Sequence, residues 1–131
     1  MITLQQIFNL AWQKFIIEQA PPAMSFDRRD REFRCEYVTK DGSRCAVGLA
    51  IPVEQLTYEE QTVTFPSLVD RYPEWFDASV CANYHLREFQ ASLHDDLASK
   101  ETGQWKFSNS EMADMYRVVA ENFNLTVPSG S

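Results

Sequence analysis

The segment from Cys35 to Gly48 constrains the fold of this chain most strongly, because its pattern predicts a β-hairpin. At its centre lies Asp41-Gly42, a pair typical of the type I′ turn, in which both central residues need positive φ angles. Residues that favour strands precede this turn (Tyr37, Val38 and Thr39) and follow it (Val47). We expect helices on both sides of the hairpin to bury their apolar faces against it.

Apolar residues at helical spacing predict a first helix from about Leu4 to Gln19 and a long central helix from about Ala78 to Lys100. The central helix is apolar on two sides, which is typical of a helix sandwiched between layers. A third amphipathic helix is predicted after Ser108. The spacing of a capping box begins at Thr3 before the first helix and at Ser108 before the last.

These patterns predict an α+β fold of three main helices packed around one β-hairpin, with an irregular middle segment at about residues 52–77. Because 131 residues suffice for one hydrophobic core, we expect a single globular domain over residues 1–127 and a flexible C-terminal tail at 128–131. Residues 23–34 carry charges of both signs. This composition favours a solvated connection over an anion-binding patch.

The charge balance bears on possible partners. The chain has 19 acidic and 12 basic residues, a formal net charge of −7. Direct nucleic-acid binding is not expected, because such proteins normally neutralise phosphates with a basic face. The sequence shows neither a signal peptide nor a run long enough to span a bilayer, and its three cysteines suit a reducing compartment. We therefore expect a cytoplasmic protein without a membrane segment.

Two of the cysteines leave a choice between packing and metal binding. An even loop in the predicted hairpin places Cys35 and Cys45 on opposite faces, whereas an odd loop or a bulge places them on one face. They are either small buried side chains or, together with His94 and Asp95, ligands of a zinc ion. Cys81 and His85 have a chelating spacing of four on the predicted central helix. Two ligands alone do not complete a structural zinc site.

A polar stripe on the central helix supplies the candidate binding residues. Gln90 and His94 are four residues apart and adjacent on one helix face, near Arg87. These three, with Asp95, are the candidate contacts for a ligand or a partner. Gln90 and His94 could instead hydrogen-bond to the hairpin backbone, since buried polar groups need partners. No complete catalytic constellation is present, so no catalytic residue is predicted.

The hairpin and the central helix resemble a group of small uncharacterised bacteriophage and prophage proteins. The pattern is Cys-x-Tyr, Asp-Gly, Cys-Ala-Val-Gly and an apolar-Pro step, followed by a Gln…His-Asp helix and a Trp. The matching residues are Cys35, Tyr37, Asp41, Gly42, Cys45, Ala46, Val47, Gly48, Ile51, Pro52, Gln90, His94, Asp95 and Trp105. The chain departs from the pattern with Phe89 in place of Leu and with one extra residue before His94.

The resemblance implies a phage origin, with the cytoplasm of the host cell as the site of action. With the missing catalytic set and the acidic charge, it favours a non-enzymatic accessory protein that binds a host or phage protein, including inhibition of a host enzyme. A small metal-dependent or Cys/His enzyme using Cys35, Cys45, His94 and Asp95 is the first alternative. A small-ligand sensor or sponge, with Arg87, Gln90 and His94 as polar contacts, is the second.

Overall fold

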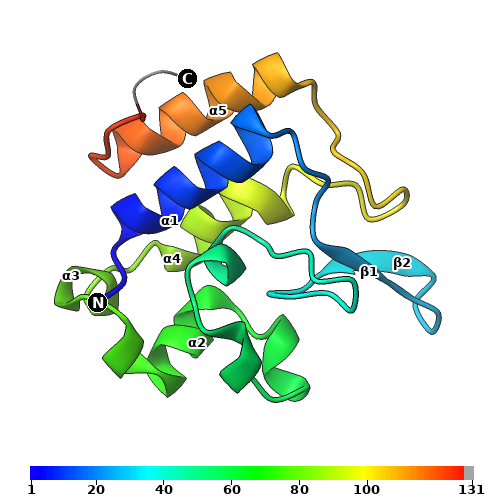
Figure 1. The fold of residues 1–131 in the computed structure, drawn as a ribbon, viewed down its shortest axis with the longest axis horizontal. Helices are drawn as coiled ribbons and strands as arrows, with labels where there is room; N and C mark the ends of the chain where they lie inside the picture. The colour runs from blue at the N-terminus through cyan, green and yellow to red at the C-terminus, as the bar shows by residue number, and fades with distance from the viewer. Residues whose placement is uncertain (129–131) are drawn as a thin grey trace.

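The computed structural model describes residues 1–128 and has the predicted α+β architecture (Figure 1). Five α-helices and one two-stranded antiparallel sheet lie in this range. They are α1 (Leu4–Ala11), β1 (Met24–Asp27), β2 (Glu32–Cys35), α2 (Phe65–Arg71), α3 (Ala78–Cys81), α4 (Leu86–Gln90) and α5 (Asn109–Asn122). Of the predicted flexible tail, residues 129–131 lie outside the described part of the chain.

The N-terminal helix begins where the sequence predicts. The Thr3 hydroxyl accepts a hydrogen bond from the Gln6 backbone N–H, and the Gln6 side chain accepts one from the Thr3 backbone N–H, so the predicted capping box is confirmed. Helix α1 continues directly into a π-helical turn, Trp12–Ile17. Together they nearly fill the predicted span. A second capping box, between Ser108 and Glu111, opens α5 as predicted.

The predicted position of the hairpin is wrong. The paired strands are β1 and β2, in the segment predicted to be a solvated connection, with Met24 opposite Cys35. Asp41-Gly42 does form a turn, and Gly42 has a φ of +88°. Of the strand pairing predicted around this turn, only an isolated bridge between Val38 and Arg44 forms.

Local hydrogen bonds explain the shift of the hairpin. The Asp27 carboxylate accepts from the backbone N–H groups of Arg29 and Asp30 and so stabilises a tight turn within a charged sequence. The backbone N–H of Tyr37 donates to Gln61 O at 3.1 Å, so the predicted strand is held by the middle segment. After the turn, Val47–Leu49 form a 3₁₀-helix rather than a strand.

The predicted continuous central helix is also wrong. Helix α3 ends at Cys81, and α4 begins only at Leu86, before continuing into a π-helical turn, Ala91–Asp95. In the gap, the Asn83 side chain accepts a hydrogen bond from the His85 backbone N–H at 2.6 Å. Such local bonds of asparagine compete with helical ones. Cys81 therefore lies at the end of a four-residue helix, and it does not share a helix face with His85.

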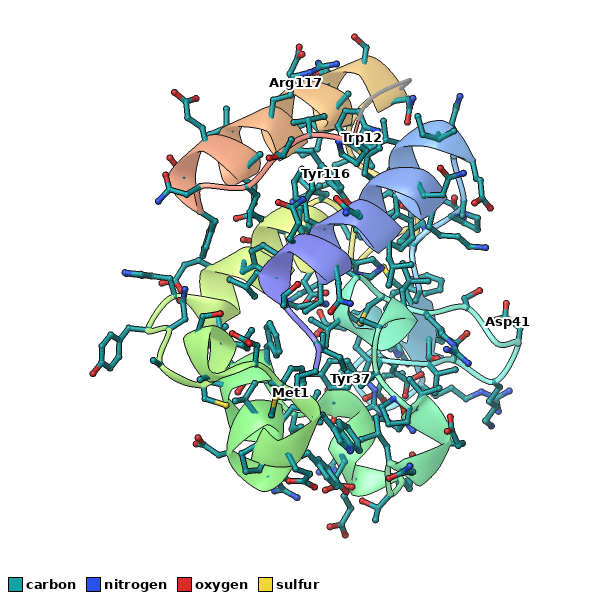
Figure 2. The ribbon with its side chains drawn as sticks, turned by 60° about the vertical axis from the view of Figure 1, so that its left-hand side comes forward. Met1, Trp12, Tyr37, Asp41, Tyr116 and Arg117 are labelled. Carbon is teal, nitrogen blue, oxygen red and sulfur yellow. The ribbon has the colours of Figure 1, made fainter. Side chains whose placement is uncertain are left out.

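The core lies between the N-terminal helix, α5 and the α4 region (Figure 1). The ring of Tyr116 on α5 lies 5.8 Å from that of Phe8 and 6.1 Å from that of Trp12. Figure 2 shows Trp12 and Tyr116 between the two helices, with Arg117 above them. At the C-terminus, Asn124 adopts a φ of +55°, and Leu125 N donates to Ala120 O, which ends the helix in a left-handed conformation.

The middle segment is irregular, as predicted, except that residues 65–71 form α2. It also contains the 3₁₀-helices Val53–Gln55, Glu59–Thr62 and Pro73–Trp75. Ile2 pairs with Phe76 in a parallel bridge, which ties the N-terminus to this segment. No helix within residues 1–128 combines the length and the apolar character needed to cross a membrane.

Candidate functional site: a polar pocket beside the α4 region

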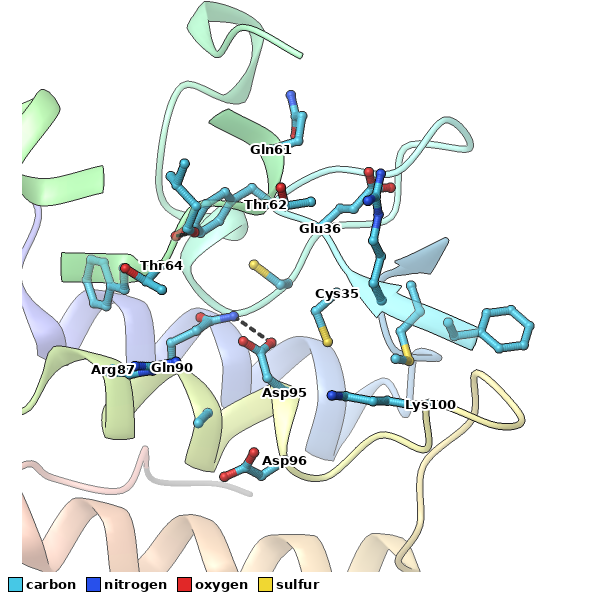
Figure 3. A pocket seen from close by; sticks show the side chains of 18 of the residues that line it. Cys35, Glu36, Gln61, Thr62, Thr64, Arg87, Gln90, Asp95, Asp96 and Lys100 are labelled. Carbon is cyan, nitrogen blue, oxygen red and sulfur yellow. Dashed lines mark hydrogen bonds between the residues drawn. The ribbon is translucent and has the colours of Figure 1, made fainter. Parts of the chain in front are cut away.

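A cavity of about 340 Å³ lies between β2, the loop at 61–65 and the helical segment that begins with α4 (Figure 3). We call it the polar pocket. Charged side chains from β2 and from the helical segment line it, residues 61–65 contribute uncharged side chains, and the aromatic rings are those of Phe33, Tyr37 and Phe65. Its volume is at the lower end of the range of small-molecule sites. The pocket therefore suits a ligand of modest size.

Asp95 is the most firmly held polar group of the pocket. One carboxylate oxygen, Oδ1, accepts hydrogen bonds from His94 Nδ1 at 2.9 Å and from Gln90 Nε2 at 3.0 Å. The bond from Gln90 is drawn in Figure 3. The side chain of Asp95 is 36% exposed, whereas that of His94 is fully buried. Asp95 thus presents a carboxylate of fixed orientation to the cavity.

Two backbone amides fix the groups that hold Asp95. The buried N–H of Val47 donates to Gln90 Oε1 at 3.1 Å, and the N–H of Ala23 donates to His94 Nε2 at 2.9 Å. A backbone N–H can only donate, so the amide orientation of Gln90 and the tautomer of His94 are both determined. His94 carries its proton on Nδ1, facing Asp95. Gln90 thus bonds to the backbone of the segment predicted to be the hairpin, as expected, whereas His94 bonds to Ala23, which lies outside that segment.

The two cysteines of the pocket are protonated thiols at neutral pH. Burial raises the pKa of Cys45 to about 12, with a further contribution from the negative charge of Asp95. Burial and the same carboxylate, to which the thiol donates a hydrogen bond, raise the pKa of Cys35 still more. Because the thiolate is the nucleophile, neither residue is an activated catalytic cysteine here.

Cys35, His94 and Asp95 form a cluster whose potential metal-ligating atoms lie within 4.8 Å of one another. A metal ion at His94 Nδ1 would need the lone pair of that nitrogen, and the proton would have to move to Nε2. There it would face the N–H of Ala23, which is also a donor. The arrangement therefore does not fit a metal ion bound through His94. Cys45 lines the pocket but does not belong to the cluster.

Three exposed cations border the pocket. Arg34 on β2 is paired with Asp27 at 3.4 Å, which leaves Arg87 on α4 and Lys100 after the π-helical turn. Figure 3 shows Lys100 extending toward Asp95 and Arg87 on the far side of Gln90. Within residues 1–128 neither side chain makes a hydrogen bond or an ion pair, although the charge of Lys100 acts on the Cys35 thiol. Both cations are available to a ligand.

The structure brings together most of the residues that the sequence singled out. Arg87, Gln90 and Asp95 line the pocket with both Cys35 and Cys45, while His94 lies buried behind Asp95, between the rings of Phe15 and Trp105. Exposed Cys81 and His85 do not line it. Sequence reasoning missed Lys100, Glu36 and the wall at residues 61–65, for which no motif gives a signal.

Comparison of the chain with protein-family models, with curated protein sequences and with solved structures gave no significant match.

Proposed function

We propose that this protein binds a small polar ligand in the polar pocket, as a sensor or a sponge for that ligand, and that it performs no covalent chemistry on it. The observation that carries this proposal is the fixed carboxylate of Asp95 in a cavity of about 340 Å³. A carboxylate held by two side chains, each anchored to a buried backbone amide, is preorganised for recognition. Preorganisation lowers the ordering cost of binding.

The chemical state of the neighbouring groups favours binding over catalysis. The nearby thiols are protonated, and both ring nitrogens of His94 already have hydrogen-bond partners. His94 therefore has no free nitrogen with which to take a proton from a substrate or from Cys35. Protein-partner binding, phage origin and a cytoplasmic location stay predictions, as does the metal-dependent alternative.

The test is release of a bound molecule. The purified protein is denatured by heat, and the small molecules set free are identified and quantified by mass spectrometry. We expect a molecule at up to one equivalent per chain, and we expect Ala91→Leu, which fills the pocket without changing charge, to lose it. Asp70→Asn, an exposed acidic residue outside the pocket, is the matched control. Equal retention of the molecule by Ala91→Leu and by the control would sink the proposal.

A chain that carries nothing after purification is examined next by thermal shift against a library of small metabolites. A ligand that binds only the folded state raises the melting temperature, by an amount that grows with the logarithm of its free concentration above Kd. We expect stabilisation of the wild type and of Asp70→Asn, but not of Ala91→Leu. The absence of any stabilising compound would overturn the assignment of a small-ligand function.

A further inference from the structure

The charges of the polar pocket restrict the ligand further, on the premise that the pocket binds a small molecule as proposed above. The carboxylates of Glu36 and Asp96 line the cavity with Asp95. A purely anionic ligand would lie against these like charges. A purely cationic one would lie near the like charges of Arg87 and Lys100. A ligand with groups of both kinds avoids both penalties.

The hydrogen bonds of Asp95 define the group that it can receive. Its Oδ1 already accepts from His94 and Gln90, so a ligand is left mainly with Oδ2. The Cys35 thiol, a weak donor, also faces this carboxylate. A stronger donor on a ligand can replace the thiol in this hydrogen bond. An ammonium or an amino N–H on the ligand is such a donor. Asp95 therefore selects a donor and not an acceptor, and an ammonium pairs with it more strongly than a neutral hydroxyl does, because both partners are charged.

The two cations define the other end of the ligand. Arg87 lies eight residues before Asp95 along one helical segment, so their Cα atoms are about 12 Å apart at 1.5 Å per residue. Because the Arg87 side chain is long, the distance between its guanidinium and the Asp95 carboxylate can be shorter than the distance between the Cα atoms. Arg87 and Lys100 lie on opposite sides of Asp95 in Figure 3. An anionic group of a small ligand can therefore reach one of the cations while its nitrogen faces Asp95.

We infer that the ligand is a small ampholyte, with an amino group facing Asp95 and a carboxylate or phosphate facing Arg87 or Lys100. Two sources supply this chemistry at the size of the pocket: a free amino acid and a nucleoside monophosphate. The aromatic rings of the lining offer apolar faces to a side chain or to a base. The amino group and the anionic group are the shared requirement.

Isothermal titration distinguishes the two sources. One arm titrates the twenty protein amino acids, and for any that binds, the analogue without the amine and the analogue without the carboxylate. The other arm titrates AMP, CMP and GMP, and for any that binds, the nucleoside without phosphate and the nucleotide whose base lacks the amino group. UMP, whose base carries no amino group, is the negative control of this arm. We expect binding in one arm, weakened at least tenfold when either the amino or the anionic group is removed.

Variants locate the two groups. Arg87→Gln or Lys100→Gln should weaken the charged probe at least tenfold and leave its anion-free analogue unchanged. Arg28→Gln and Lys106→Gln, exposed cations outside the pocket, are the matched controls. No binding in either arm, or binding indifferent to removal of the amino or the anionic group, would overturn the inference. Release of a neutral or purely cationic molecule from the native protein would do the same, while leaving the small-ligand function intact.

Discussion

At the scale of single residues, the two histidines of this chain show how strongly surroundings decide a role. His94 is fully buried, and both of its ring nitrogens are hydrogen-bonded. His85 is exposed at the start of α4, and its side chain makes no cap. The sequence presents both as polar positions of one expected helix. Only the packing of Phe15 and Trp105 around the ring distinguishes His94.

We expect His94→Ala to lower the free energy of unfolding by about 2–4 kcal/mol, because it opens a cavity and leaves the buried N–H of Ala23 without an acceptor. His85→Ala should change it by less than about 0.5 kcal/mol. Urea unfolding followed by circular dichroism measures both. Similar losses in the two variants would contradict the assigned role of His94.

The three cysteines should react in two classes with a thiol reagent such as 5,5′-dithiobis(2-nitrobenzoate). Cys81 is exposed, whereas Cys35 and Cys45 have raised pKa values through burial. At pH 8 the native protein should therefore release one equivalent of chromophore quickly, and three once unfolded in guanidinium. Cys81→Ser should abolish the fast equivalent. A fast phase that persists in this variant would show an activated thiol in the pocket.

Residue-level prediction from the sequence succeeded where side chains share a helical segment. Arg87 and Gln90 are three residues apart, so helical spacing places them on one side of α4. Asp95 bonds to Gln90, five residues before it, because Ala91–Asp95 form a π-helical turn, which the α-helical spacing of the sequence did not predict. The proximity of Cys35 to Asp95 and the place of Lys100 depend on how distant segments pack. Spacing within one element contains no information about such contacts.

At the scale of elements, the displaced hairpin shows that a sequence typical of a turn does not by itself determine which strands pair. Asp41-Gly42 correctly marks a turn, since Gly42 has a positive φ. Whether the flanking residues pair as strands depends on competing partners, and here Gln61 takes the N–H of Tyr37. The strands that do pair, β1 and β2, lie in a charged segment, and the Asp27 side chain stabilises the turn between them. Local propensity is outweighed by a tertiary contact at Tyr37, whereas the β1–β2 turn is stabilised by local hydrogen bonds of Asp27.

Gly48 should tolerate substitution least among the glycines near this turn. A Cβ atom there would lie 2.0 Å from the carbonyl oxygen of Tyr37, so the backbone would have to move. We expect Gly48→Ala to cost about 3 kcal/mol or more. A Cβ atom at Gly42 would have no other atom within 4 Å. Gly42→Ala should therefore lower the free energy of unfolding by only about 1–2 kcal/mol, because of the positive φ at this position. Denaturant midpoints compare the two, and a cheaper change at Gly48 would contradict the close approach.

At the scale of the whole molecule, titratable groups limit stability at both ends of the pH range. Hydrogen bonds lower the pKa values of four carboxyl groups, Asp41, Glu60, Asp77 and Glu111, chiefly through Thr39, Thr57, Ser79 and Ser108 in that order. Burial raises the pKa values of the Cys35 and Cys45 thiols and of the Tyr37 and Tyr116 phenols.

The stability of the fold should therefore peak between about pH 5 and pH 8. Carboxyl groups with lowered pKa values contribute stability above their unfolded pKa values of about 4, and this is lost as acid protonates the folded state. Thiols and phenols with raised pKa values oppose folding above about pH 8.5, where only the unfolded chain ionises. Urea unfolding from pH 3 to pH 10 measures the profile. Glu60→Gln should flatten its acid limb and Cys45→Ala its alkaline limb, and unchanged slopes would contradict these assignments.

The α+β class of the molecule followed from the sequence because amphipathic spacing and capping boxes report helices directly. The division of the expected central helix could not be predicted in this way, because apolar spacing continues through Ala82–His85. The hydrogen bond from the His85 backbone N–H to the Asn83 side chain does not alter that spacing. Helix α2 lies in the middle segment that was expected to be irregular, although Thr64 caps it and Pro66 suits its first turn.

The anchoring of Asp95 by Ala23 and Val47 has a consequence for the order of events during folding. Gln90 and His94 meet these amides across 43 and 71 residues of chain. Contacts of such long range form only after the loops between them have closed, which is slow compared with local helix formation. A nascent or partly folded chain can thus hold its helices without a finished polar pocket. On the small-ligand function proposed above, capture of the ligand would report completed folding, and the ligand would select chains that have reached the native topology.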